Sequence, residues 1–176
     1  MSDTNRVPRR RAAKKRGIRH WPLQVFRLLF TSLLVACIAM IFSNSLEIGV
    51  MSSARSVQVT EWLNRVLARM NTGIQLQHVT VRKMAHVAQY AALGFLLMLS
   101  MRVYTARILG HISWPLFLGL LVAVIDECLQ LLVPGRSGEL MDVALDFAGV
   151  LMGVLLGLFV LLLGKQFWQE LVAEKA

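Results

Sequence analysis

The stretch Ile125–Asp146, IDECLQLLVPGRSGELMDVALD, places charged residues between two long apolar runs. A charge inside hydrocarbon costs at least about 2.5 kcal/mol, so such residues usually face a bundle interior and find partners there. The run PGRSG at 134–138 is a strong turn signal in the middle of the stretch. We therefore interpret it as an acidic hairpin joining two membrane helices. Its charged residues are Asp126, Glu127, Arg136, Glu139, Asp142 and Asp146.

Composition supports a membrane protein. The chain has 176 residues, 56% of them hydrophobic and 16% charged, whereas soluble domains carry about 25% charged residues. A span takes about 20 apolar residues, and four runs approach or exceed that length: Trp21–Phe42, Met84–Val103, Ile108–Val133 and Leu140–Leu163. We predict an all-α membrane protein whose four transmembrane helices form one domain, 21–164. The first run also resembles a secretory signal peptide, but it is longer than a usual signal core.

The orientation follows from the distribution of basic residues. Eight of the 19 lysines and arginines lie in the first 20 positions, and basic residues flanking spans favour the cytoplasm. We predict a disordered basic cytoplasmic arm at 1–20, a short cytoplasmic tail at 165–176, and therefore both termini in the cytoplasm. Because no aromatic or nucleic-acid motif accompanies the arm, we do not expect nucleic-acid binding.

The segment between the first two spans, 43–83, is predicted to be outside the cell and to contain an amphipathic helix. Lying along the membrane interface is the favoured interpretation, and a lid over a site is the alternative. The segment carries five basic residues, which oppose this orientation but are outnumbered by the arm. The apolar positions of the helix are Val50, Trp62, Leu63, Val66, Leu67 and Met70.

In this topology the polar residues of three spans converge near the outer leaflet. At a rise of 1.5 Å per residue, His86, Asp126 and Asp146 each lie about 8–10 Å inside their helix ends, at a shared level. We assign His86, Asp126 and Glu127 as candidate acid–base residues. The candidate ligand-binding residues are Arg82, Lys83, Tyr90, Gln130, Arg136, Asp142 and Asp146.

The chemistry of these residues fits an anionic ligand, because arginine makes paired hydrogen bonds to phosphate or carboxylate. The carboxylates would also suit a divalent cation, although we assign no metal site and no cofactor. Structural roles are the alternatives for several of these residues. Arg82 and Lys83 would anchor their helix at the membrane interface, and Asp142 would favour the positive N-terminal end of its helix. Asp126 would form an ion pair with Arg82 or Arg136. Gly149, Gly153 and Gly157 form a doubled GxxxG stripe that predicts close helix packing.

The ordered combination of motifs resembles the VanZ-like family of bacterial membrane proteins over about residues 40–160. Asp146 stands where an asparagine is common in that family, and Gln89 where an acid can occur. The resemblance is carried by Arg82-Lys83-Met84-Ala85-His86 with Tyr90, Asp126-Glu127 with Gln130, Pro134-Gly135-Arg136, Asp142 and Gly149.

The resemblance implies an envelope-associated protein of about four helices, in a family named after a protein associated with low-level teicoplanin resistance. It implies no reaction. Our first hypothesis is a bacterial inner (plasma) membrane protein that binds membrane lipids, either an anionic lipid or a lipid-linked cell-wall precursor. A membrane enzyme acting on such a headgroup and a proton-coupled transporter are the alternatives, although the chain shows no internal repeat of the kind transporters often have. The sequence predicts no oligomeric state.

Overall fold

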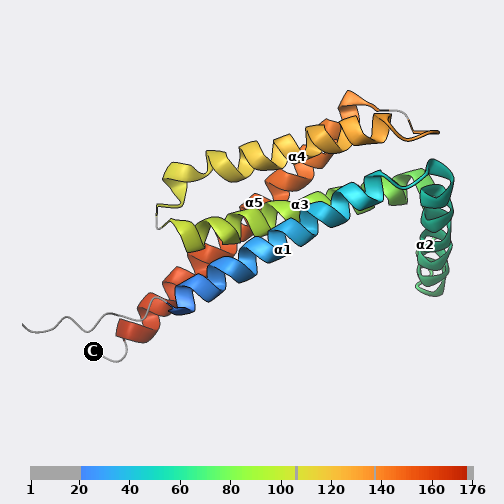
Figure 1. The fold of residues 1–176 in the computed structure, drawn as a ribbon. Helices are drawn as coiled ribbons and strands as arrows, with labels where there is room; N and C mark the ends of the chain where they lie inside the picture. The colour runs from blue at the N-terminus through green and yellow to red at the C-terminus, as the bar shows by residue number, and fades with distance from the viewer. Residues whose placement is uncertain (1–20, 106, 137, 174–176) are drawn as a thin grey trace, which may run out of the picture.

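The computed structural model describes residues 21–105, 107–136 and 138–173. Within these ranges the chain is helical and contains no strand (Figure 1). The elements are α1 (Trp21–Ser45), α2 (Gly49–Arg69), α3 (His78–Tyr104), a 3-10 turn η1 (Leu109–His111), α4 (Ser113–Leu131) and α5 (Leu140–Ala173). Four segments, 24–45, 78–104, 109–131 and 140–165, are long and apolar enough to cross a membrane. The predicted all-α fold with four spanning helices is confirmed.

Two helix starts differ from the predicted ones. Helix α3 begins at His78, six residues before the expected start at Met84 (84 − 78 = 6), so its first turns are polar. Helix α4 begins at Ser113 rather than 108. Its Pro115 lies in the first turn, where the missing N–H has no helical acceptor to lose. An apolar run therefore locates the span but not the polar first turns of its helix.

The end of the fourth span also differs. We expected a helix end near Leu163, but α5 continues through Lys165 to Ala173. A glycine and a lysine do not stop a helix that is held elsewhere by packing. The predicted arm at 1–20 lies outside the described residues, and the division of the chain into arm, domain and tail stays a prediction.

Helix α3 is the centre of the bundle: it packs against α1, α2 and α4, and most extensively against α5. Of the four largest fully buried side chains, Tyr90, Leu93 and Met98 belong to α3 and Ile41 belongs to α1, and Val150 and Val154 of α5 are part of the same core. Because membrane helices gain little from apolar burial against each other, contact of this kind depends on close packing.

Glycines bring α3 and α5 into backbone contact. A Cβ on Gly153 would overlap the Ala91 carbonyl oxygen, and one on Gly149 would lie 2.6 Å from the Val87 carbonyl oxygen. Gly94 of α3 meets the Val150 backbone in the same way. The small-residue stripe therefore lies against α3 and fixes how the polar first half of α5 faces that helix.

Helix α2 runs across the end of the bundle where α1 ends and α3 begins (Figure 1). This is also the end at which α4 finishes and α5 starts (Figure 1). The start of α1 and the end of α5 lie together at the end of the bundle that is away from α2 (Figure 1). Trp62 of α2 is 57% exposed, which suits a helix at a membrane surface.

Asn64 holds α2 to the loop that leads into α3. Its Nδ2 donates to the Leu76 carbonyl oxygen at 3.0 Å, and its Oδ1 accepts from the Leu76 N–H at 2.8 Å. Asn64→Ala should lose about 1–3 kcal/mol from these two bonds. We expect faster hydrogen exchange at 70–77 with unchanged exchange in α5; equal protection of 70–77 in both proteins would contradict this role.

Candidate functional site

Acidic side chains are buried at the end of the bundle that lies next to α2. Asp126 is 0% exposed and Asp146 is 2% exposed, and Glu127 of the same α4 turn is also buried. Tyr90, one turn after His86 on α3, is buried with them. Moving a carboxylate out of water costs several kcal/mol. The groups that surround each buried carboxylate therefore decide what the site can do.

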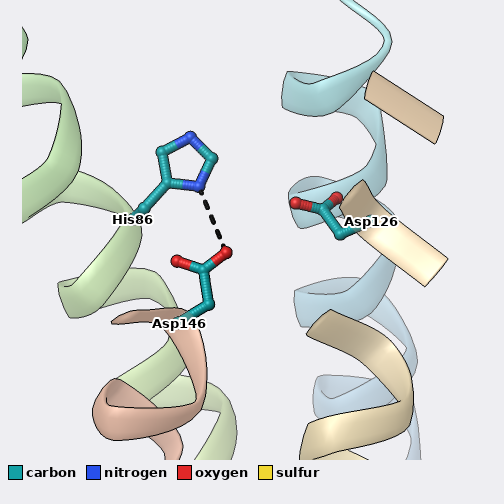
Figure 2. Close-up of side chains that lie close together, drawn as sticks. All are labelled: His86, Asp126 and Asp146. Atoms are coloured by element: carbon teal, nitrogen blue, oxygen red, sulfur yellow. Dashed lines mark ion pairs between the residues drawn. The ribbon is translucent and has the colours of Figure 1, made fainter. Parts of the chain in front are cut away.

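His86, Asp126 and Asp146 form a cluster contributed by three helices, α3, α4 and α5 (Figure 2). His86 Nδ1 lies 3.8 Å from Asp146 Oδ2, and one ligand atom of each residue lies within 4.8 Å of the other two. Figure 2 shows the Asp126 carboxyl group directed from the neighbouring helix toward this pair. We name these three residues the His–Asp–Asp cluster. Their nitrogen and oxygen atoms are potential metal ligands and potential proton carriers.

The Asp126 carboxyl group is only partly satisfied. Its Oδ2 accepts a hydrogen bond from Gln130 Nε2 at 3.2 Å, whereas Oδ1 has no partner in the described structure. The buried Tyr90 hydroxyl likewise has none. Neither Arg82 nor Arg136 lies within ion-pair distance of Asp126 among the described contacts, so the structural pairing considered from the sequence is wrong.

Glu127 and Asp142 take other partners. Glu127 Oε1 accepts the Glu139 backbone N–H at 2.6 Å, which ties the end of α4 to the approach to α5. Lys83 Nζ donates to Asp142 Oδ1 at 2.7 Å and joins α3 to α5. Both contacts fasten helices together, and of the three predicted acid–base residues only His86 and Asp126 belong to the cluster.

Arg82 and Arg136 lie close together, and neither forms an ion pair with a carboxylate of the residues that the structure describes. Arg136 donates from Nη2 to the Asn44 carbonyl oxygen at 3.1 Å, while its buried Nε has no acceptor. Burial lowers the pKa of the Arg136 guanidinium, and the nearby charge of Arg82 acts in the same direction. Arginine still stays protonated in proteins, so two positive charges face the same region.

That region is a cavity of about 170 Å³ between α2 and the bundle. We name it the arginine cavity. A smaller pocket of about 20 Å³ shares Arg82 and His86 with it and is also lined by Lys83, Gln130, Asp142 and Asp146. The arginine cavity is lined by Arg82 and Arg136 together with Asn44, Glu47, Ser52, Arg55, Ser56, Val59, Val81, Ala85, His86 and Gln89.

Sequence reasoning named no lining residue from α1 or α2, although it gave a lid over a site as the alternative role of the segment that forms α2. Ser52, Ser56 and Val59 line the cavity at spacings of four and three residues, which is the signature of one helix face. Glu47 accepts from Arg55 Nη2 at 2.6 Å and so neutralises one cation of the wall. The spacing was available in the sequence, but nothing there indicated which face of α2 meets the bundle.

The fold and this site define a polytopic α-helical membrane protein with a buried polar site at one end of its bundle. The profile of the VanZ/LLP1 family matches residues 28–162. Because the match covers most of the chain, the protein belongs to the VanZ/LLP1 family. No curated protein and no solved structure matches it.

Proposed function

We propose that this protein binds the phosphate headgroup of an anionic lipid or a lipid-linked cell-wall precursor in the arginine cavity. The supporting observation is the juxtaposition of Arg82 and Arg136 in a cavity at the end of the bundle, where neither guanidinium pairs with a carboxylate of the described part of the chain. A phosphate would accept paired hydrogen bonds from such groups and relieve their mutual repulsion.

The setting of the cavity suits a lipid. It is lined by the end of α1, the start of α3 and one face of α2, so a headgroup held there would lie at the ends of spanning helices while its chains stay in hydrocarbon. The basic arm at the N-terminus favours an orientation that places this end at the outer leaflet of the inner (plasma) membrane. A role in the cell envelope follows, and through the bound precursor an influence on teicoplanin susceptibility.

The test is lipid binding by the full-length protein in detergent, read by native mass spectrometry with lipids identified after extraction. Arg82→Ala should bind phosphate-bearing lipid about 10- to 100-fold more weakly, because a hydrogen bond to a charged group contributes about 1.5–3 kcal/mol. Arg69→Ala is the matched control, since Arg69 is exposed at the end of α2 and outside the cavity lining. Equal binding by both variants would rule out the assignment.

A membrane enzyme acting on the same headgroup is the second candidate. The observation that favours it is that His86 lines the arginine cavity and also lies 3.8 Å from Asp146. An imidazole beside a carboxylate is a suitable proton acceptor or donor for a group held by arginines. The same mass spectra separate the candidates: a binding protein returns the lipid unchanged, whereas an enzyme returns a lipid with an altered headgroup.

A further inference from the structure

The charges of the His–Asp–Asp cluster do not balance within the described structure. Asp126 and Asp146 are both buried, and the cationic group within ion-pair distance of either is the imidazole of His86, which lies near Asp146. An imidazole carries at most one positive charge. The two carboxylates therefore have at most one positive charge near them. Their buried surroundings have a low dielectric constant, so uncompensated charge is strongly unfavourable there.

Two buried polar atoms without a partner belong to the cluster or to a residue one helical turn from it. Asp126 Oδ1 is buried without a hydrogen-bond partner although its carboxyl group is directed toward the His86–Asp146 pair (Figure 2). The Tyr90 hydroxyl, one helical turn from His86, is also buried without a partner. Buried polar groups almost always have partners, so an unpaired group in a native structure calls for an explanation, and a bound ion is one that also addresses the charge of the two carboxylates.

The spacing suits a metal ion better than direct hydrogen bonding. The 3.8 Å between His86 Nδ1 and Asp146 Oδ2 is too long for a hydrogen bond. It is close to the separation of about 3.4 Å expected between two ligand atoms of a tetrahedral ion whose metal–ligand bonds are near 2.1 Å. The ligand atom of Asp126 lies within 4.8 Å of the other two, so it would have to approach by no more than about 1.4 Å to complete such a shell.

We propose that His86, Asp126 and Asp146 bind a divalent metal ion of the zinc and manganese class. One imidazole and two carboxylates are ligands that these ions accept. Three protein ligands also leave a coordination position open, as in catalytic zinc sites. The pocket of about 20 Å³ lined by His86 and Asp146 lies beside two of the proposed ligands, and it shares Arg82 and His86 with the arginine cavity. The inference does not depend on lipid binding, because the ion would bind to the protein alone.

The test uses tag-free full-length protein in detergent, so that no polyhistidine segment supplies ligands. The protein is stripped with chelator, equilibrated with Zn²⁺ or Mn²⁺ separately, and assayed for bound metal by mass spectrometry and for the shift of its thermal midpoint. We expect about one equivalent of one of these ions and a raised midpoint, because a ligand of the native state stabilises it.

Asp126→Asn and His86→Gln should each weaken metal binding more than about 100-fold, since even second-shell substitutions at metal sites cost 10- to 100-fold. Asp142→Asn is the control, because Asp142 pairs with Lys83 and is not one of the three proposed ligands. Stripped wild-type protein that takes up neither ion would overturn the proposal, as would metal binding that persists in both variants. Size-exclusion profiles that match wild type establish that loss of metal is not loss of fold.

Discussion

Gly153→Leu is expected to lower the thermal midpoint of the protein by about 2–12 °C or to prevent assembly of the bundle. A Cβ at this position would overlap the Ala91 carbonyl oxygen and crowd the Phe95 backbone nitrogen. These are backbone atoms of α3, which cannot move aside as a side chain can. Overpacking a tight interface costs about 1–3 kcal/mol or more, and 1 kcal/mol is about 2–4 °C for a chain of this size.

Gly164→Leu on the same helix is the matched control for Gly153→Leu. A Cβ on Gly164 meets no other atom within 4 Å. Both substitutions raise helix propensity by the same amount, so their difference isolates the contact with α3. The measurement is loss of the monodisperse size-exclusion peak on heating, and equal midpoints for the two variants would show that α3 and α5 are not held in backbone contact here.

Asp126→Asn is expected to change stability in opposite directions with and without metal. In chelator the variant should be more stable than wild type by about 1–3 kcal/mol, because asparagine removes a buried, partly unsatisfied charge. Its side-chain oxygen can still accept the hydrogen bond from Gln130. With saturating Zn²⁺ or Mn²⁺ the wild type should gain stability and overtake the variant, because binding of an ion stabilises the native state.

Thermal midpoints of both proteins, each measured in chelator and in metal, check this crossing. Glu127→Gln serves as the comparison: the glutamine oxygen can still accept the Glu139 backbone N–H, and Glu127 is outside the His–Asp–Asp cluster. That variant should respond to metal as wild type does. If Asp126→Asn gains as much from metal as wild type does, Asp126 is not a ligand.

The fold could be predicted because membrane spans are encoded locally. A run of apolar residues long enough to cross a bilayer predicts a helix without knowledge of its neighbours, and four such runs fixed the order of the bundle. The shared depth of His86, Asp126 and Asp146 followed from helical rise alone, and the structure brings them together. Helical spacing likewise placed Gly153 on one face of the fourth helix, where it now meets α3.

The pairing of charges could not be predicted, because it depends on the rotation of each helix about its own axis. Asp126 and Glu127 are adjacent in sequence, yet one faces the His86–Asp146 pair and the other the backbone of Glu139. Lys83 likewise pairs with Asp142, whereas the neighbouring Arg82 lines the arginine cavity. Adjacent residues on a helix point about 100° apart, so a small error in rotation exchanges their roles.

Helix α5 has a practical consequence for experiments on live cells. Its 34 residues extend for about 51 Å, well beyond the hydrocarbon thickness of about 30 Å. Since α5 begins beside the site, its last turns lie at the opposite end of the bundle (Figure 1). A fluorescent reporter fused beyond Ala173 would stand clear of both cavities, and in the proposed orientation it would mature in the cytoplasm.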